Sequence, residues 1–525
     1  MRCACHGCGA YMVHSESLTL GCVCPECGRR CTDCLGTGTL LSKEDFKKLA
    51  ENPQFARDYG AEAFYYAPPA RTRRPTTWFG VHPDRRRTSM AINGARNYRP
   101  RFHYTPEKGW INDPNGLLFD GKTYHLFAQH YPSVENIGPM HWSHAVSDDL
   151  IHWRHLPIAL YPDRLGACWS GSGCVIGGKI ALMYTSTGET QQQSVAFSED
   201  GVHFTPWPGN PVIPNPGVPD YRDPKLFWND VLGKYGVAVA AGDHVEFFAS
   251  EDLIHWQETG RFSDQARVSG IHECPDVFPL TAPDGSRVFV MIASMILPDG
   301  SGNHTQYVLG DFDGHTYRIT HPFDQPDWID GGYDDYAPVT FWGLEEKIMI
   351  GWARDWAYAH RLPTGDFLGA MTCPRKLSLK ETLRGLRMAQ EPLMDAITGA
   401  YKRTAALPGE CFRIRLQAEG DFRLTLKNVR GEKLTLGREN EAYFIDRRQA
   451  GEWGKAPEIP EKFGVARRER YVSGKTEMDV LFDVSLLEAF ADGGTYAATM
   501  AAFPTAPYTR VEAEGCTFEI AELKG

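Results

Sequence analysis

The sequence predicts an all-β protein in which a five-bladed β-propeller is followed by a C-terminal β-sandwich and preceded by a small zinc-ribbon-like module. Three observations predict this: a segment that repeats at intervals of about 50 residues, a change of strand pattern near residue 401, and eight cysteines within the first 34 residues. The parts expected are a zinc-ribbon-like module (1–40), a short helix and basic linker (41–100), the propeller (101–384), a connector (385–400) and the sandwich (401–525).

The N-terminal cysteines have the spacing of metal ligands. Cys5-x2-Cys8-x15-Cys24-x2-Cys27 is spaced like a zinc ribbon, and Cys31-x2-Cys34 adds a further knuckle. Four thiolates satisfy a tetrahedral Zn²⁺ and leave no open position, so we expect one or two zinc ions with a structural role. The alternative is a set of disulfides, which the two-residue spacing within each pair disfavours. The expected zinc ligands are Cys5, Cys8, Cys24, Cys27, Cys31 and Cys34.

A basic arm follows the cysteines. Residues 42–60 predict a short helix, and the nine arginines and several prolines between residues 67 and 101 predict a linker. Residues 1–101 carry a net charge of +7 and the remainder −18. We expect the arm to lie on the acidic catalytic domain or on a neighbouring subunit, so that the module mediates protein contact or self-association. A nucleic-acid contact is the other interpretation, which the few aromatic residues of the arm and the overall charge of −11 disfavour.

Composition bounds the class of protein. A chain of 525 residues with 42% hydrophobic content allows two or three globular domains. It contains no apolar run of 18 residues or more, and its opening residues Met1–Cys5 show no signal-peptide pattern. We therefore expect no membrane association and a cytoplasmic location.

The internal repeat predicts the propeller. Ser147–Trp153 recurs as Ser198–Phe204 and as Ser250–Trp256, at offsets of 51 and 52 residues, and a degenerate fourth copy is Asp311–Tyr317. A repeat of about 50 residues built from short strands is the length of one propeller blade. Residues 101–380 therefore hold five blades. The histidines of these repeats are expected to be structural, because they occupy the wrong blade phase for a site on the channel rim.

A second periodicity predicts where the site lies. Asp113 belongs to the stretch Trp110–Gly116, where Pro114 restrains the backbone and holds the carboxylate at a strand end. Residues at one phase of successive blades line one rim of the central channel, so chain-distant side chains should converge there. Steps of 57, 53, 50 and about 62 residues from Asp113 reach Ser170, Asp223, Glu273 and then Asp334 or Asp335.

Strand patterns support both β domains. Thr123–Phe127, Ile180–Tyr184 and Val288–Ile292 are apolar runs bounded by turn residues, as in blade strands. From residue 401 the alternation changes: Phe412, Ile414 and Leu416, then Phe422, Leu424 and Leu426, face one way with charged residues between them. This alternation is typical of the half-buried strands of a β-sandwich. Leu386–Gly399 is expected to be a helical or coiled connector.

At this point the motifs resemble those of a known family. Trp110–Gly116, Arg222-Asp223-Pro224 and Glu273-Cys274-Pro275 are similar to the three signature motifs of glycoside hydrolase family 32, the β-fructofuranosidases. Supporting segments in the same order are Gly138–Trp142, Tyr333–Pro338, Cys373–Leu377, Phe444–Arg447 and Leu487–Phe490. The resemblance covers residues 101–525. It implies a propeller with a sandwich, hydrolysis that releases terminal β-D-fructofuranosyl units with retention, a small-molecule sugar as the partner and no cofactor for catalysis.

The resemblance also implies roles for single residues. Asp113 would be the nucleophile, Glu273 the acid/base and Asp223 the group that holds two ring hydroxyls. Three acids around one small rim repel one another, so the last to ionise has a raised pKa and donates a proton near neutral pH. Cys274 is expected to pack beside Glu273 rather than to react. The same carry-over gives the expected sugar contacts as Asn112, Gln129, Trp169, Ser170, Arg222 and Asp335.

Two departures from the family leave the leaving group open. Ile137 stands where the family usually has Trp, and Ala128–Pro132 replaces its usual Tyr-Gln-Tyr-Asn-Pro. We expect the substrate to be sucrose, sucrose 6-phosphate or a short fructo-oligosaccharide. Three other functions stay open: a fructosyltransferase that uses the same nucleophile, an inverting furanosidase on a related five-bladed propeller, and a sugar sensor without catalysis.

Overall fold

The structure, a computed structural model, describes residues 13–15, 21–23, 30–31, 96–134, 138–263, 270–297, 303–324 and 326–525, the first three ranges by their backbone alone. The chain divides into two compact units, 1–88 and 89–525. In the first unit, β1 (Val13–Ser15), β2 (Gly21–Val23) and β3 (Arg30–Cys31) form an antiparallel sheet in that order. The expected helix 42–60, the expected zinc ligands Cys5, Cys8, Cys24, Cys27 and Cys34, and the side chain of Cys31 lie outside the described residues.

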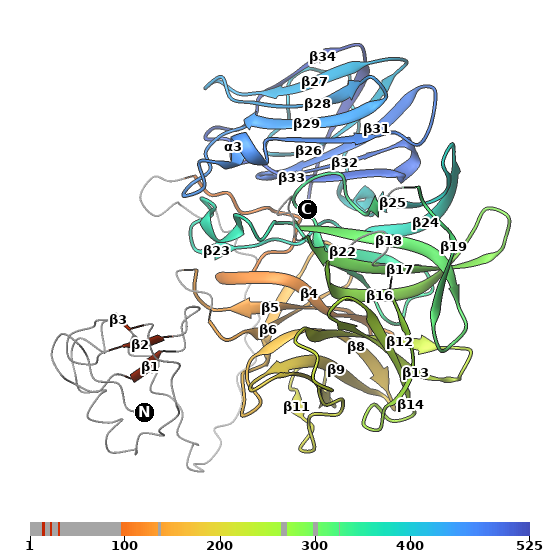
Figure 1. Cartoon of the computed structure of the whole chain (residues 1–525). Helices are drawn as coiled ribbons and strands as arrows, with labels where there is room; N and C mark the ends of the chain where they lie inside the picture. The colour runs from red at the N-terminus through yellow and green to blue at the C-terminus, as the bar shows by residue number, and fades with distance from the viewer. Residues whose placement is uncertain are drawn as a thin grey trace. The chain divides into compact units, whose positions relative to one another are not determined.

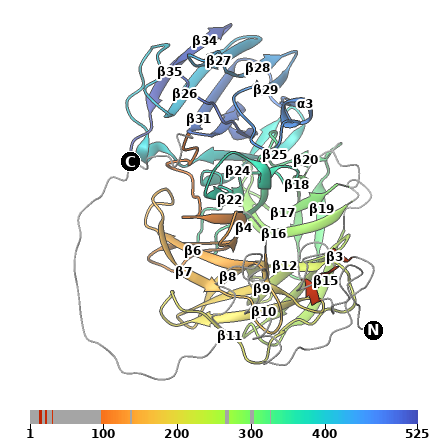
Figure 2. The ribbon, with the colours of Figure 1, turned by 90° about the vertical axis from the view of Figure 1, so that its left-hand side faces the viewer.

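Five sheets in the described part of the second unit are the blades of the propeller (Figure 1, Figure 2). The first contains β4 (Gly109–Phe119), β5 (Tyr124–Tyr131), β6 (His141–Ser147) and β7 (Arg154–Leu160), together with β23 (Phe367–Leu368). The second contains β8 (Cys168–Ile176), β9 (Lys179–Thr187), β10 (Gln191–Ser198) and β11 (Thr205–Pro206). The third contains β12 (Tyr221–Asn229), β13 (Lys234–Ala241), β14 (Val245–Ser250) and β15 (Gln257–Phe262).

The remaining two blades complete the ring. The fourth contains β16 (Ile271–Thr281), β17 (Arg287–Ile296), β18 (Asn303–Phe312), β19 (Tyr317–His321) and β20 (Asp327–Trp328). The fifth contains β21 (Tyr336–Thr340), β22 (Ile348–Trp352), β24 (Arg375–Thr382) and β25 (Gly385–Pro392). The inner strands β4, β8, β12, β16 and β21 contact one another in that order, and β21 contacts β4. This confirms the predicted five-bladed propeller.

The sequence repeat forms the same turn in successive blades. Asp149, Asp200 and Asp252 each accept hydrogen bonds at 2.8–3.0 Å from the backbone N–H groups two and three positions later. The histidine three positions later also contacts the second carboxylate oxygen, at 2.6–2.7 Å. Asp313 of the degenerate fourth copy accepts the two backbone bonds alone. The histidines therefore close exposed turns between the third and fourth strands of their blades.

Apolar clusters fill the space between neighbouring blades. The pairs that represent them are Phe127 with Leu182, Met183 with Val237, Phe247 with Met291, Val290 with Leu377, and Ile350 with Ile111. These side chains are at most a few per cent exposed. Because full burial of one such side chain contributes about 1.5–3 kcal/mol, the clusters hold the inner strands in a fixed ring.

The connector differs from the prediction. Residues 385–392 form β25, the outer strand of the fifth blade, rather than the start of a helical or coiled linker. Leu386 and Met388 are buried against Leu377 and Leu379 of β24, because alternate residues of a strand face the same side. The connection to the next domain follows Pro392 and includes a short 3-10 helix, η4 (Asp395–Ile397).

The C-terminal domain is the predicted β-sandwich. Its strands are β26 (Cys411–Ala418), β27 (Phe422–Lys427), β28 (Lys433–Glu439), β29 (Ala442–Gln449), β30 (Val465–Glu469), β31 (Thr476–Asp483), β32 (Leu486–Ala491), β33 (Tyr496–Ala501), β34 (Arg510–Glu514) and β35 (Thr517–Glu522). They form one sheet of order β33-β32-β31-β26-β35 and one of order β30-β29-β28-β27-β34, and a short helix α3 (Ile459–Lys462) joins β29 to β30. The predicted apolar faces of β26 and β27 are buried between the two sheets.

Buried charges join the propeller to the sandwich. Arg375 of β24 is fully buried, and its guanidinium donates to Asp330 and Asp335 near the fifth blade and to Glu488 of β32. His103, which precedes the first blade, lies between Asp483 and Glu488, with both ring nitrogens at 2.8 Å from a carboxylate oxygen. Burial opposes the charge of His103, but the two carboxylates raise its pKa to about 9.

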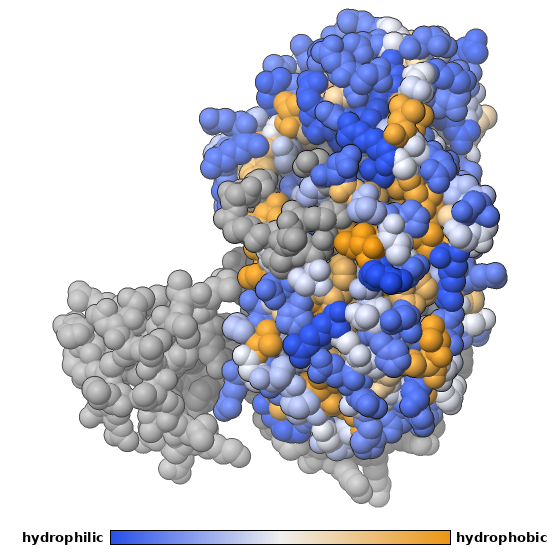
Figure 3. All heavy atoms as spheres, turned by 45° about the vertical axis from the view of Figure 1, so that its right-hand side comes forward, coloured by the Kyte–Doolittle hydropathy of each residue, from blue (hydrophilic) through white to orange (hydrophobic). Residues whose placement is uncertain are grey.

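The face of the second unit that Figure 3 shows is mainly polar. On the face shown in Figure 3, hydrophilic residues predominate and apolar residues gather in separate small groups. Within the part of the chain that the structure describes, no helix has both the length and the apolar character that a membrane crossing requires.

Candidate active site

Every inner strand breaks its pairing with the next strand at the same level of the propeller. The register shifts lie between Ile111 and Pro114, Trp169 and Gly171, Arg222 and Lys225, Glu273 and Asp276, and Tyr336 and Val339. A β-bulge turns side chains out of the regular alternation. These five bulges therefore aim side chains of chain-distant segments at one rim of the channel.

Three of the bulges share a strained backbone. Asp223, Cys274 and Ala337 have φ values of 62°, 44° and 52°, although none is glycine, and each is followed by proline. Non-glycine residues in this region cost of order 1–3 kcal/mol and persist where the surrounding structure determines them. The residues that precede them, Arg222, Glu273 and Tyr336, occupy equivalent positions in blades three, four and five.

Asp113 is held by one oxygen of its carboxylate. Oδ2 accepts hydrogen bonds from Ser170 Oγ at 2.6 Å and from Gln129 Nε2 at 3.1 Å. Oδ1 is buried and has no hydrogen-bond partner among the described residues. The carboxylate is thus fixed in orientation by blades one and two, while Oδ1 keeps its lone pairs available.

Glu273 is clamped from the neighbouring blades. Its Oε1 accepts from Arg222 Nη2 at 3.0 Å and Nε at 3.2 Å, and its Oε2 accepts from Tyr336 O–H at 2.5 Å. Burial raises the pKa of Glu273 and the charge of Asp113 raises it further, whereas Arg222 and Tyr336 oppose the shift. The net pKa is above the usual value, and the side chain is still 17% exposed. A carboxyl group of this kind donates a proton at a higher pH than a free glutamic acid.

Asp223 shares contacts with these two acids, since Cys274 also contacts Asp113 and Arg222 also contacts Glu273. Its Oδ2 accepts from Cys274 N–H at 2.9 Å, and Arg222 Nε lies 3.9 Å away. Burial raises the pKa of Asp223 to about 7, with contributions from Glu273 and Asp113, against the opposing charge of Arg222. The three carboxyl groups therefore lie close enough for their charges to interact.

The thiol of Cys274 bridges two of the acids. Its Sγ is 3.6 Å from Asp113 Oδ2 and 3.5 Å from Asp223 Oδ2, so one sulfur atom contacts both carboxylates. Burial and the neighbouring carboxylates raise the pKa of the thiol well above its ordinary value. The group therefore stays protonated, in agreement with the expectation that it packs rather than reacts.

The structure places four of the six expected sugar-contact residues at the acids, namely Asn112, Gln129, Ser170 and Arg222. Gln129 and Ser170 hold Asp113, and Arg222 holds Glu273. Asn112 precedes Asp113 on the same bulge, and its Oδ1 accepts from Trp110 Nε1 at 2.7 Å. Trp169 precedes Ser170 and is half-buried beside the aromatic core of the first blade.

Asp335 lies elsewhere, and this placement corrects the sequence-based expectation. Its Oδ2 accepts from Arg375 Nη1 at 2.9 Å in the buried junction with the sandwich, and its side chain is 1% exposed. Asp334 is likewise buried and bonded to Tyr358 and Arg447. The fifth blade contributes Tyr336 instead. The shared proline predicts this: Tyr336-Ala337-Pro338 aligns with Arg222-Asp223-Pro224 and Glu273-Cys274-Pro275.

Two further residues of the site were not predicted from the sequence. Arg222 Nη1 donates to Asp220 Oδ1 at 2.5 Å and to Gln191 Oε1 at 3.2 Å. These contacts fix the guanidinium that clamps Glu273. Neither residue belongs to a recognisable motif, and their contact depends on how blades two and three pack.

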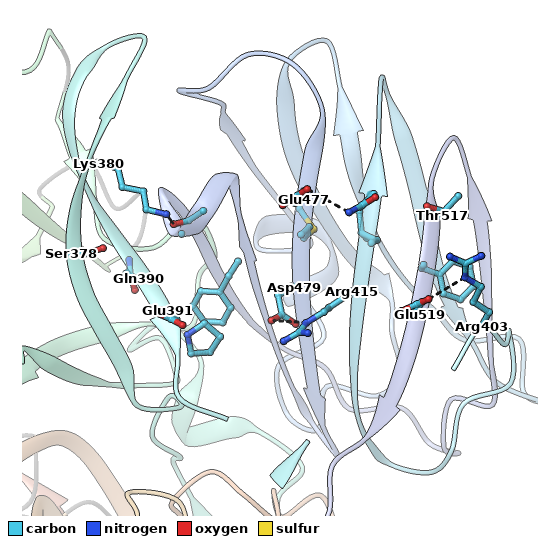
Figure 4. A pocket seen from close by; sticks show the side chains of 18 residues that line it. Ser378, Lys380, Gln390, Glu391, Arg403, Arg415, Glu477, Asp479, Thr517 and Glu519 are labelled. Atoms are coloured by element: carbon cyan, nitrogen blue, oxygen red, sulfur yellow. Dashed lines mark hydrogen bonds and ion pairs between the residues drawn. The ribbon is translucent and has the colours of Figure 1, made fainter. Parts of the chain in front are cut away.

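A separate hollow of about 720 Å³ lies between the β24–β25 hairpin and the sandwich (Figure 4). Its charged residues pair with groups of its own walls: Arg403 lies 3.0 Å from Glu519, Arg415 4.0 Å from Asp479, and Lys380 donates to a backbone carbonyl. None of the three acids of the rim lines it. Across the described ranges, no group of three or more His, Cys, Asp or Glu residues is arranged to hold a metal ion.

Comparisons with known proteins agree with this geometry. Residues 103–392 match the model of the glycosyl hydrolases family 32 N-terminal domain, and residues 397–524 match that of the family 32 C-terminal domain. A levanase of Bacillus subtilis is 35% identical over 447 residues, which cover 76% of this chain and 65% of the levanase. An extracellular exo-inulinase of Aspergillus niger is 31% identical over 499 residues, which cover 79% of this chain and 91% of the inulinase.

Solved structures show the same architecture. The exo-inulinase of Aspergillus awamori superposes with a TM-score of 0.74 at 26% identity and covers 83% of this chain and 100% of its own. A β-fructofuranosidase of Bombyx mori superposes with a TM-score of 0.68 at 27% identity, covering 81% of this chain and 94% of its own.

Proposed function

Because the chain belongs to glycoside hydrolase family 32, we propose that it is a retaining β-fructofuranosidase. It would release terminal β-D-fructofuranosyl units from sucrose, sucrose 6-phosphate or short fructo-oligosaccharides. The observation that carries this proposal is the pair of differently held acids: Asp113 has one oxygen bonded and one free, and Glu273 has a raised pKa. Retaining hydrolysis needs one ionised carboxylate and one carboxylic acid on either side of the glycosidic bond.

In the first step, Asp113 Oδ1 attacks the anomeric carbon of the fructosyl unit. Glu273 gives its proton to the leaving oxygen as the glycosidic bond breaks, so the aglycone departs as an alcohol and Glu273 becomes a carboxylate. Ser170 and Gln129 keep Oδ2 occupied, which leaves Oδ1 as the attacking atom. The product is a fructosyl ester of Asp113.

In the second step, the Glu273 carboxylate takes a proton from water. The hydroxide that forms attacks the anomeric carbon, the ester bond to Asp113 breaks, and fructose leaves with its configuration retained. Arg222 and Tyr336 hold both oxygens of Glu273, so the same side chain serves as acid and as base without changing position. Asp223, held by the Cys274 N–H, would bind the ring hydroxyls of the fructosyl unit.

The two segments that depart from the family pattern bear on the choice of leaving group. Of the two departures from the family, Ile137 lies outside the described residues. His130 in the other departure has one ring nitrogen 2.8 Å from the Trp110 carbonyl, and burial lowers its pKa to about 4. It is therefore a neutral wall of the pocket at physiological pH and supplies no positive charge to a phosphorylated aglycone.

A substrate panel tests the proposal. The purified full chain is offered sucrose, sucrose 6-phosphate, kestose and inulin, and fructose release is followed as kcat/KM. Asp113→Asn is expected to reduce kcat by at least about 10³-fold, because the amide forms no stable ester. Asp311→Asn, at an exposed position near the end of β18, is the matched control and retains full activity. Wild-type protein that releases fructose from none of these sugars contradicts the proposal.

We propose further that the N-terminal module holds structural zinc through Cys5, Cys8, Cys24, Cys27, Cys31 and Cys34. The support is the ligand spacing of the sequence together with the short antiparallel sheet β1-β2-β3, whose third strand ends at Cys31. Metal analysis of the full chain is expected to give one or two zinc ions, reduced in Cys24→Ser. A metal-free chain whose N-terminal cysteines resist thiol reagents until reduction would instead indicate disulfides.

We also propose that the protein is cytoplasmic and that its N-terminal module mediates protein contact or self-association. A cytoplasmic location keeps such thiolates reduced and fits the six free cysteines of the second unit. Contact with protein, or self-association, is tested by comparing the molar mass in solution of the full chain with that of residues 89–525, which form a compact unit. Equal association states for both proteins contradict a role of the module in assembly.

A further inference from the structure

A row of aromatic side chains leads outward from the acids across the first blade. Strand register sets the order: Trp110 of β4 stands opposite Tyr131 of β5, and His130 of β5 stands opposite His141 of β6. Tyr161 follows directly on the last residue of β7. The three members, Tyr131, His141 and Tyr161, thus lie at the same end of the blade as Asp113.

The rings contact one another in sequence. The ring centroids of Tyr131 and His141 are 6.4 Å apart, and those of His141 and Tyr161 are 5.4 Å apart at an interplanar angle of 78°. Exposure rises along the row, since Tyr131 and His141 are half-buried and Tyr161 is 51% exposed. The row is therefore a continuous aromatic surface that begins opposite Trp110, three positions before Asp113, and ends in solvent.

The surroundings fix the row and set its polarity. His141 Nδ1–H donates to the Pro139 carbonyl at 3.0 Å, so Nε2 of the neutral ring remains as an acceptor. Burial lowers the pKa of His141 below its ordinary value, which keeps the ring neutral. Cys168 Sγ contacts the Tyr161 carbonyl at 3.3 Å and ties the row to β8, which carries Trp169. No member of the row carries a charge at neutral pH.

The corresponding edges of the next two blades are different. At the same end of the propeller, the β9–β10 turn carries Gly188, Glu189 and Thr190, and the β13–β14 turn carries Gly242, Asp243 and His244, whose ring lies against the carboxylates of Asp243 and Glu246. These turns offer polar groups, negative charge and one imidazole held by carboxylates, rather than a series of rings in contact. Among these three edges, the first blade alone provides a rigid amphipathic surface, of the kind that aromatic rings with polar tips form at binding sites.

We propose that Tyr131, His141 and Tyr161 bind the sugar units that follow the leaving oxygen, so that neutral oligosaccharides with two or more such units are preferred to sucrose. The inference rests on the proposed function, because it assumes that the fructosyl unit lies between Asp113 and Glu273. Sugar rings would place their C–H faces on the aromatic rings and their hydroxyls toward Nε2 and the phenolic groups. A phosphorylated aglycone gains no charge-assisted contact from the row, because none of its three members is Arg or Lys.

The test compares substrates of increasing length. We measure kcat/KM for sucrose, kestose and nystose in the wild type, Tyr161→Ala and Trp228→Ala. Trp228 is the matched control because it is also 51% exposed and lies near the end of β12 away from Arg222. The wild type is expected to prefer nystose to sucrose, and Tyr161→Ala to reduce that preference about fivefold, mainly through KM. Tyr161→Phe is expected to retain most of the preference.

Two results overturn the inference: a wild type with no preference for the longer sugars, and a Tyr161→Ala variant that keeps the full preference. A binding measurement separates this failure from failure of the proposed function. The affinity of Asp113→Asn for nystose, measured by calorimetry, is expected to fall about fivefold when Tyr161→Ala is added. If the wild type hydrolyses none of the sugars, the proposed function fails, and the calorimetry still decides whether the row binds oligosaccharide.

Discussion

Removing the phenolic oxygen of Tyr336 is expected to move the alkaline limb of the pH profile to higher pH. Tyr336 O–H donates to Glu273 Oε2 at 2.5 Å and the residue is 1% exposed, so Tyr336→Phe removes this hydrogen bond and keeps the ring packing. The bond favours the ionised carboxylate and therefore lowers the pKa of Glu273. Without it the pKa rises. Because the first step needs Glu273 protonated, activity then persists to higher pH.

The magnitude follows from the strength of one charge-assisted hydrogen bond. Such a bond contributes about 1.5–3 kcal/mol, and one pKa unit corresponds to about 1.4 kcal/mol. Arg222 still donates two N–H groups to the other oxygen of Glu273, and the carboxyl group is 17% exposed, so solvent replaces part of the loss. We therefore expect the alkaline limb of the pH profile of kcat/KM for sucrose to move to higher pH by about one pH unit in Tyr336→Phe.

Tyr307→Phe provides the matched control. Tyr307 is also buried, and its O–H donates to a carboxylate, Asp327 Oδ2, at 2.7 Å, but it lies on β18 away from the three acids. This variant is expected to lower the melting temperature without moving the pH profile. An alkaline limb of Tyr336→Phe that stays at the wild-type position or moves to lower pH would refute the account of Glu273.

Three further predictions concern buried groups outside the reacting pair. Arg375→Met leaves three carboxylates of the domain junction without their shared cation, so the free energy of unfolding measured in urea should fall by about 3–5 kcal/mol; an unchanged transition midpoint contradicts this. His103 has its pKa raised from 6.5 to about 9, so its contribution to stability is complete below pH 6.5 and is lost as the pH rises through 9. The melting temperature of the wild type should therefore fall more steeply over this interval than that of His103→Gln, and equal slopes would count against the buried cation. Burial raises the pKa of Cys274, so iodoacetamide in mildly alkaline buffer should leave the native enzyme active, whereas inactivation with labelling at this residue would show a reactive thiolate.

The propeller was predictable because one local interaction recurs in sequence. Asp149, Asp200 and Asp252 each close the same turn through the same backbone donors, and the chain spacing between them is one blade. A short-range hydrogen-bonding pattern of this kind leaves a visible repeat. The alternation of Phe412 and Ile414 in β26 predicted the sandwich for a similar reason, since its period is that of a strand with one buried face.

The blade spacing predicted which segments of blades one to four converge, but it gave no sign of Gln191 or Asp220 and named the wrong residue in the fifth blade. The search for an acidic residue one blade length after Glu273 led to Asp335. The feature that blades three, four and five share is instead a strained residue followed by proline. That feature selects Tyr336, which precedes Ala337-Pro338 and holds Glu273. Asp335 has a different role: its carboxylate pairs with the buried Arg375 at the junction with the sandwich.

Long-range contacts account for what the sequence did not predict. The outer strand of the fifth blade was expected to be a connector, because the sequence around Leu386 and Met388 shows no clear strand pattern. The burial of these two side chains against β24 determines their conformation. Arg375 and Glu488 are 113 positions apart, and their contact depends on the docking of the two domains. Such pairs follow from tertiary packing rather than from local pattern.

The central claim is that Asp113 forms a covalent bond with the fructosyl unit while Glu273 controls the proton. Trapping tests it most directly: Glu273→Gln is mixed with a β-fructosyl fluoride, whose fluoride leaves without protonation, and the digested protein is examined by mass spectrometry. The account predicts a peptide containing Asp113 that is heavier by one fructosyl unit, because no base remains to activate water. A fructosyl group on Asp223 would contradict it, and so would fluoride release with inverted fructose and no modified peptide.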